Sequence, residues 1–130
     1  MFGYNARGIN EYSRIGLETG VAAANPHKLI VMLYEGAISA CNLAVPHIQN
    51  KAFAEKGIAL SKAIMIIESG LRVSLNKEAG GEIAESLDAL YAYMSNRLYI
   101  ANLKNEAKPV HEVVKLLGEL KSAWEGMLTN

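Results

Sequence analysis

Apolar residues recur at helical spacing along most of the chain, and this periodicity limits the possible folds more than any other feature. At about 100° per residue, three long segments each place their large apolar side chains on one narrow stripe. The expected core stripes are Phe53, Leu60, Ile64, Ile67, Leu71 and Leu75 in one segment, Ile83, Leu87, Leu90, Tyr91, Met94 and Leu98 in the next, and Val110, Val113, Leu117, Leu120, Trp124 and Leu128 in the last. No pattern typical of a β-hairpin accompanies them, so the sequence predicts an all-α protein.

Turn and capping signals divide the chain into four expected helices. Asn25-Pro26 is typical of an N-cap followed by proline at the first helical position, and Pro109 has the same place after a polar stretch. Gly80-Gly81 and the segment 49–51 indicate turns. The helices are expected at about 26–48, 51–76, 82–105 and 109–128. Because short connections favour antiparallel neighbours, we predict an antiparallel up-down four-helix bundle.

Two regions depart from this regular pattern. Pro46 lies inside the first expected helix, and because a proline removes one backbone hydrogen bond there, we expect the helix to kink or stop near Val45. Residues 1–25 hold glycines too closely spaced for a stable isolated helix, yet Tyr4 and Tyr12 are among several apolar side chains that favour contact with a surface. We therefore expect residues 1–25 to form a mobile N-terminal flap or cap packed on a bundle domain of residues 26–130.

Composition excludes several classes of function. A chain of 130 residues that is 51% hydrophobic is long enough for one domain with a real core. Its 13 Lys+Arg balance 13 Asp+Glu, so no net charge favours binding to nucleic acid. The sequence shows neither a secretory signal nor an apolar run of about 20 residues that would cross a bilayer, and Cys41 is the single cysteine. These features predict a cytoplasmic protein without membrane insertion and without an internal disulfide.

Patterns that carry catalysis or hold a cofactor are also missing from the sequence. Di-iron bundles need Glu-x-x-His pairs, and none of His27, His47 and His111 follows a glutamate at that spacing. A c-type haem needs Cys-x-x-Cys-His, which one cysteine does not supply. The serines of the expected helices lack a nearby histidine and acid at usable spacing, and no glycine-rich phosphate loop follows a strand. We therefore expect no metal, no cofactor and no enzymatic activity.

More informative are the apolar residues that lie outside the core stripes. On the second expected helix, polar residues such as Lys62 mark the outward pole, and apolar residues lie close to it on both sides. The third helix has a similar surplus, and the first carries Val31, Ile38 and Val45 beside its polar row. Since bundle helices are normally polar there, the chain has more apolar surface than one four-helix core uses. The off-core residues that we expect to bind a partner are Ile58, Met65, Ile66, Val73, Tyr93, Tyr99, Ile100 and Leu103.

Three interpretations of this apolar surplus stay open. An amphipathic or disordered partner segment fits it, with anchors at helical spacing in grooves between the helices. Self-association, or burial under the N-terminal flap, would cover the same residues, and long helices also tolerate scattered exposed apolar side chains. Flap and partner are compatible if they compete for the same surface, so that the flap leaves as the partner enters.

Several segments together resemble one known family. They are 25–37 (NPHKLIVMLYEGA), 62–67 (KAIMII), 80–84 (GGEIA), 90–94 (LYAYM), 97–102 (RLYIAN) and Ala123-Trp124. In this order, and with the N-terminal tyrosines, they resemble the flagellar export chaperones called FliS over nearly the whole chain. The positions that match the motifs of that family are Tyr4, Tyr12, Ile64, Ile67, Leu90, Tyr91, Met94 and Leu98, whereas Pro46 departs from them.

This resemblance implies a cytoplasmic chaperone for flagellin. Members of the family are antiparallel helical bundles that bind the disordered C-terminal region of flagellin, prevent its premature polymerisation and deliver it to the flagellar type III export apparatus. The resemblance also implies an N-terminal stretch that covers part of the binding surface, and contacts with export components or an anti-sigma factor. We expect a monomer or weak dimer. The alternative from the residues alone is a homo-oligomeric structural or adaptor bundle whose apolar band is used for self-association.

Overall fold

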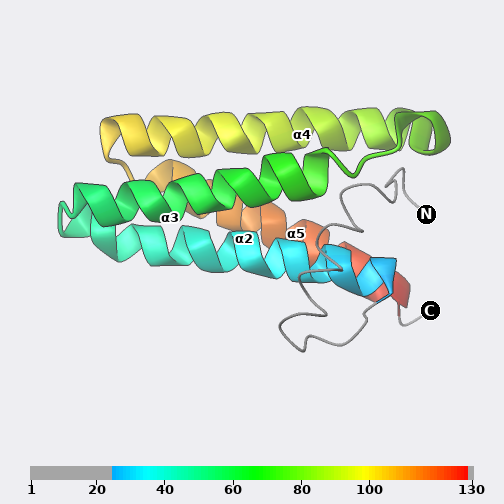
Figure 1. The fold of residues 1–130 in the computed structure, drawn as a ribbon, viewed down its shortest axis with the longest axis horizontal. Helices are drawn as coiled ribbons and strands as arrows, with labels where there is room; N and C mark the ends of the chain where they lie inside the picture. Colours follow the sequence, from blue (N-terminus) through cyan, green and yellow to red (C-terminus); the bar gives the residue numbers. More distant parts are fainter. Residues whose placement is uncertain (1–24, 129–130) are drawn as a thin grey trace.

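The computed structural model describes residues 25–128, which form four helical rods. They are α2 (Pro26–Gln49), α3 (Phe53–Met65) continued by the π-helix η1 (Ile66–Arg72), α4 (Lys77–Lys104) and α5 (Lys108–Leu128). The rods alternate in direction, with α2 and α3 side by side, α4 along α3 and α5 behind them (Figure 1). The predicted all-α antiparallel four-helix bundle is confirmed. The expected cap residues Tyr4 and Tyr12 lie outside the described residues.

Asparagine side chains set the beginnings of two helices. Asn25 Oδ1 accepts a hydrogen bond from the backbone N–H of Lys28 at 2.9 Å, which confirms the expected cap at the start of α2. Asn76 does the same for Ala79 at 3.2 Å, so α4 begins before the paired glycines. Gly81, with φ of 53° and ψ of −129°, puts a kink inside α4 in place of the predicted turn ahead of it.

The core lies along the axis between the four rods. Most of the predicted stripes are buried there, including Leu60, Ile67, Leu71, Leu75, Tyr91, Met94, Leu98, Val110, Val113, Leu117 and Trp124. Ile64, Leu87, Leu90 and Leu120 pack against this cluster while partly exposed, and the side chain of Leu128 is outside the described part. The hydroxyls of Tyr34 and Tyr91 lie 2.6 Å apart within the core and join α2 to α4.

Two residues predicted to be core are exposed instead. Phe53 is 57% exposed because it is the first residue of α3, and its ring lies beside the ammonium of Lys56, whose nitrogen is 4.9 Å from the ring centre. Ile83 is 53% exposed and lies two residues after the kink at Gly81, where the regular helical phase of α4 begins. Neither local change is visible in a periodicity calculated for a straight helix.

The expected interruption at Pro46 does not occur, because α2 continues through it to Gln49. Proline deprives the carbonyl of the residue four positions earlier, Asn42, of its helical donor. Asn42 and Pro46 are both on the exposed side of α2, so water can reach that carbonyl and the helix continues.

The same helix is the one described segment that is long and apolar enough for a bilayer span by length and composition. Half of its apolar window is buried inside the bundle, as in the core helix of a folded domain. Its apolarity is therefore explained by packing against α3 and α5.

Candidate partner-binding surface

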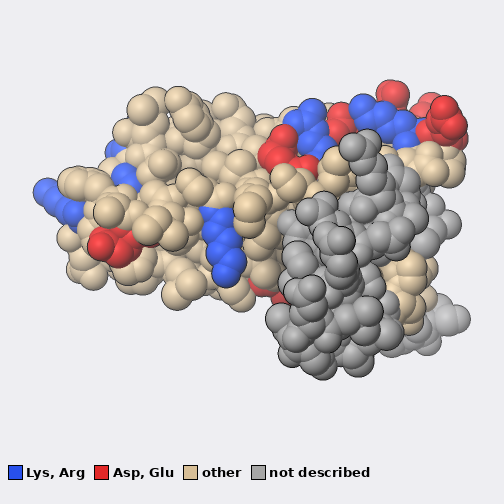
Figure 2. All heavy atoms as spheres, in the orientation of Figure 1, with Lys and Arg blue, Asp and Glu red and all other residues tan. Residues whose placement is uncertain are grey.

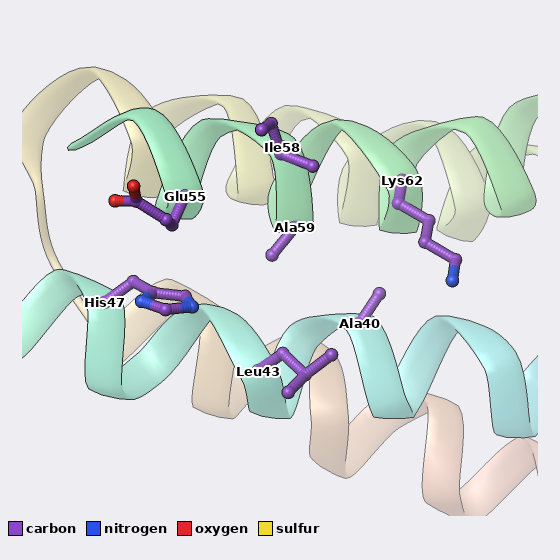
Figure 3. Close-up of a pocket in the computed structure, with 7 residues that line it drawn as sticks. All are labelled: Ala40, Leu43, His47, Glu55, Ile58, Ala59 and Lys62. Atoms are coloured by element: carbon purple, nitrogen blue, oxygen red, sulfur yellow. The ribbon is translucent and has the colours of Figure 1, made fainter. Parts of the chain in front are cut away.

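A shallow apolar groove runs between α2 and α3 on the outside of the bundle. We call it the α2–α3 groove; it is lined by Ala40, Leu43 and His47 of α2 and by Glu55, Ile58, Ala59 and Lys62 of α3 (Figure 3). Its volume is about 310 Å³. Ile58, predicted to face a partner, is 72% exposed at its edge, and Leu43 is 60% exposed on the opposite helix. An apolar side chain from another segment would find apolar surface on both walls.

Small residues let α2 and α3 approach each other closely beneath this groove. Ala37, Ala40 and Ala44 of α2 and Ala59 and Ala63 of α3 are all buried. Further along, Gly36 has no side chain, and a Cβ there would lie 3.4 Å from Cδ1 of Ile66. The two helices form the most extensive contact among the described rods.

This close approach buries Ile66, which the sequence analysis placed on the partner-binding surface. Ile66 is only 7% exposed, because its side chain fills the space that Gly36 leaves on α2. Ile66 is also the first residue of η1, where the backbone hydrogen bonds change from the α-helical to the π-helical pattern. The 100° spacing assumed for α3 therefore no longer gives the direction of its side chains. The predicted outward position of Ile66 is therefore wrong.

The charged side chains of the groove lie toward its two ends. Glu55 is near His47 at one end, and the chain of Lys62 bends toward α2 at the other (Figure 3). Within the described part of the chain, none of the groove-lining side chains makes a hydrogen bond or an ion pair. The groove thus offers an apolar centre flanked by an acidic and a basic group that have no partner among residues 25–128.

The opposite flank of α3 is closed by polar contacts, and we call these the α3–α4 seam. Nε of Arg72 donates to Oδ1 of Asp88 at 2.6 Å, and Nζ of Lys77 lies 3.0 Å from Oδ2 of the same carboxylate. The hydrogen bond from Arg72 holds the pKa of the Asp88 carboxyl below its usual value.

Two further contacts extend the seam along α3 and η1. Ser95 Oγ donates to Oε2 of Glu68 at 2.9 Å, and Nζ of the buried Lys56 donates to the carbonyl oxygen of Asn102 at 2.9 Å. Together with the Arg72 pair, these bonds connect the first turn of α3, the π-helix and most of α4.

The outer face of α4 carries the remaining predicted residues in two different settings. Tyr99 and Leu103 lie one turn apart and are 60% and 70% exposed. Ile100 is partly buried. Tyr93 has an exposed ring, but its hydroxyl donates to Oε2 of Glu112 on α5 at 2.7 Å.

The contact of Tyr93 belongs to a small polar group between α4 and α5. Nε of Arg97 donates to Oε1 of Glu112 at 2.7 Å, so both carboxylate oxygens are used. The hydrogen bond from Tyr93, followed by that from Arg97, lowers the pKa of the Glu112 carboxyl, and the same bond raises the pKa of Tyr93. Tyr93 therefore differs from Tyr99, which is 60% exposed and has no side-chain hydrogen bond within residues 25–128.

Figure 2 shows how the charges are distributed over the face that contains α3. Charged side chains gather most densely over the first half of α4, while the rest of this face is mostly uncharged surface with separate acidic and basic groups. Of the predicted set, Ile58, Met65, Val73, Tyr93, Tyr99 and Leu103 are exposed, and they are distributed over α3, the end of η1 and α4. Among these residues, only Ile58 lines the groove.

Leu43 is the functional candidate that sequence reasoning missed. It shares a helical stripe with the exposed residues Ser39 and Pro46, and an apolar residue within such a stripe was the available signal. A second apolar hollow of about 190 Å³ lies at the other end of the bundle, lined by Tyr34, Ile83, Leu87, Leu120, Ala123, Trp124 and Met127.

Groups able to do chemistry are not assembled on the described surface. Residues 25–128 contain no cluster of three or more His, Cys, Asp or Glu that would hold a metal ion. Cys41 is buried in α2, and burial raises the pKa of its thiol to about 12, so it packs as a small apolar side chain. What the described surface offers is contact area.

Comparison with known proteins agrees with this description. Residues 8–130 match the family model described as "Flagellar protein FliS". The "Flagellar secretion chaperone FliS" of Salmonella typhimurium is 46% identical over 94% of this chain and 90% of the relative, and that of Escherichia coli is 43% identical over 96% and 92%. The relative of the same name in Bacillus subtilis is 34% identical over 83% of this chain and 79% of its own length.

The relatives are named as chaperones, which is a non-enzymatic role. The match covers nearly the whole chain, and it agrees with a helical bundle whose described surface presents apolar side chains. The chain therefore belongs to the FliS family of flagellar proteins.

Proposed function

We propose that this protein binds the disordered C-terminal region of flagellin in the bacterial cytoplasm, prevents its premature polymerisation and delivers it to the flagellar type III export apparatus. The observation that carries the proposal is the set of exposed apolar side chains on a bundle whose own core is complete. Ile58, Met65, Tyr99 and Leu103 are all more than half exposed. Membership of the FliS family supports a secretion partner for this surface.

The physical basis is the capture of apolar faces that would otherwise lead to self-assembly. A disordered segment that folds on binding loses conformational entropy, so it needs a large contact surface for stable yet reversible binding. Apolar residues on several sides of the bundle allow a long segment to contact more than one groove. Met65 has an unbranched side chain that adapts to different neighbours.

Residues 1–25 complete the proposed mechanism as a removable cover of this surface. The cover leaves when flagellin enters, and contact with the export machinery favours later release of flagellin. Export components and an anti-sigma factor are the further partners that we propose for the assembled chaperone. The protein itself acts as a monomer or weak dimer.

The proposal is tested by copurification with a C-terminal fragment of flagellin from the same organism, followed by titration calorimetry. Ile58→Asp and Leu103→Asp each place a charge on exposed apolar surface and should weaken fragment binding about tenfold or more, since a partner would have to bury that charge. Ser122→Asp, on exposed surface of α5, adds the same charge and should leave binding unchanged.

Light scattering of the free protein separates this function from the homo-oligomeric alternative. We expect a monomer, or a dimer that dissociates on dilution and on addition of the fragment. A tight dimer that does not bind the fragment, and that Ile58→Asp or Leu103→Asp dissociates, would show that a second copy covers the apolar surface.

A further inference from the structure

The α2–α3 groove combines apolar walls with two charged groups at fixed spacing. Glu55 and Lys62 are seven residues apart on α3, which corresponds to about 10 Å along the helix axis, or two helical turns. Ile58 lies between them on the outer side of the same helix, and Leu43 lines the groove from α2, with Ala59 and Ala40 between the two helices (Figure 3). The groove therefore has an acidic end, an apolar middle and a basic end.

We propose that this groove binds an amphipathic helix of the secreted partner, here called the client, and that this helix carries an apolar anchor between a basic and an acidic residue. The basic residue faces Glu55, the anchor lies between Ile58 and Leu43, and the acidic residue faces Lys62. The inference rests on the proposed function, because it names the chemistry of one client segment and the groove that receives it.

A helical occupant fits the shape of the groove. Two neighbouring helices form its walls, and the floor contains Ala40 and Ala59, whose short side chains allow a third helix to lie close to both. Residues three or four positions apart share one face of a helix, so an anchor with charges three or four residues before and after it matches the spacing of Glu55, Ile58 and Lys62. A helix of about two turns is enough to span them.

Glu55 and Lys62 have no partner among the described residues, which explains why these two charges would select an occupant. On the other flank of α3, Glu68 and Arg72 are held by Ser95 and Asp88 of α4. Neither Glu55 nor Lys62 has such a contact within the described part of the chain. A segment with the reverse order of charges would meet like charges at both ends, and this repulsion gives the groove a preferred direction for its client.

The direct test uses two synthetic helical peptides with the same composition and the same leucine anchor. The matching peptide carries a lysine and a glutamate four residues to either side of the leucine, and the second peptide has these two charges exchanged. Because both peptides can bind in either direction, each is tethered through one end to a cysteine introduced at Ser61→Cys in a protein with Cys41→Ser. Ser61 is exposed on α3, one position before Lys62 of the groove.

Tethering is followed as the equilibrium yield of mixed disulfide in a glutathione buffer. In the parent protein, one order of charges should be preferred about tenfold, as expected for two attractive rather than two repulsive exposed pairs. The double variant Glu55→Lys, Lys62→Glu should reverse the preference. A double variant Lys115→Glu, Glu119→Lys, which exchanges two exposed charges on α5, should leave it unchanged.

Any other result in this experiment would contradict the proposal. Equal yields for the two peptides, yields no higher than for a short unstructured thiol peptide, or a preference that the Glu55 and Lys62 exchange does not reverse would overturn the proposed recognition. A dimer in light scattering that Ile58→Asp dissociates, combined with equal yields, would assign the groove to a second copy of the chain and overturn it as well.

The flagellin fragment separates failure of this inference from failure of the proposed function. If the fragment binds while the peptides show no preference, the function stands and the charge recognition is wrong. If the fragment does not bind while the preference is present and reverses as expected, the groove recognises such a helix and flagellin is not its source.

Discussion

The two flanks of α3 face their neighbouring helices in opposite ways. Toward α4, long polar side chains bridge the two helices, with Arg72 bonded to Asp88 and Lys56 to the carbonyl of Asn102. Toward α2, alanines bring the helices together, and the groove above them is lined by Leu43 and Ile58. The polar flank uses its hydrogen-bonding groups within the protein, whereas the apolar flank leaves its surface available.

This difference shows why exposed apolar surface does not weaken the fold. Helices that pack through small residues already bury their contact beneath the groove, so the larger side chains above it are not needed for the core. The α3–α4 seam is a different solution, since polar side chains there reach across a wider separation. A partner can therefore occupy the apolar flank without competing with contacts that hold the bundle together.

The largest expected effect concerns two adjacent residues beside the apolar flank. Ile66→Asp should reduce the free energy of unfolding by about 3–5 kcal/mol, because it places a charge in the buried space opposite Gly36. Met65→Asp, one position earlier and exposed, should change it by less than about 1 kcal/mol. Urea unfolding monitored by circular dichroism measures both, and similar losses for the two variants would contradict the separation between sealed and open surface.

An intermediate effect is expected at the polar flank. Asp88→Asn should lower the free energy of unfolding at neutral pH by about 1 kcal/mol, because it removes the negative charge that pairs with Arg72 and Lys77. The folded-state pKa of Asp88 is lowered, so its contribution is present above the unfolded value and is lost as the pH falls through the folded one.

The gap between the parent protein and Asp88→Asn should therefore shrink from about pH 7 to about pH 3. Urea unfolding at several pH values in this interval measures it. A gap of constant size would mean that the charge of Asp88 does not stabilise the seam, and Glu78→Gln, an exposed residue in the first turn of the same helix, provides the control for a general charge effect.

The smallest effect is expected within the groove itself. Leu43→Ser should change the free energy of unfolding by about 0.5 kcal/mol or less, because its side chain is already largely in water. Leu60→Ser, which affects a fully buried leucine of the facing helix, should cost several kcal/mol by comparison, at least the roughly 2–5 kcal/mol of a leucine truncation. If the two leucines proved equally costly, the groove would be part of the core.

Much of the fold follows from the sequence because the helical pattern is strong and the turns are chemically distinct. Asn25 caps α2 as expected, and Leu60, Tyr91 and Leu117 are buried as their stripes require. Pro46 did not interrupt α2, since the cost of a proline depends on whether the freed carbonyl reaches water. Phe53 and Ile83 were placed in the core because the spacing of a straight, uninterrupted helix contains neither the start of α3 at Phe53 nor the kink at Gly81.

The candidate site was less accessible to sequence reasoning. The wheel identified Ile58, Met65, Tyr99 and Leu103 as outward residues, and they are exposed. The helical spacing could not identify Leu43 as the opposite wall of a groove. Which face of α2 lies beside which face of α3 depends on how each helix is rotated about its own axis, and the spacing within one helix does not contain this. Ile66 was misplaced for the same reason, since its burial depends on a glycine thirty positions earlier on another helix.

The sequence alone determined that the chain forms four amphipathic helices and has more apolar surface than one core uses, since both follow from residue type and spacing along each helix. Only the tertiary structure decided which of those residues are sealed and which stay open. Burial is a property of two packed surfaces: Gly36 receives Ile66, while Leu43 and Ile58 stand apart above the small residues between their helices.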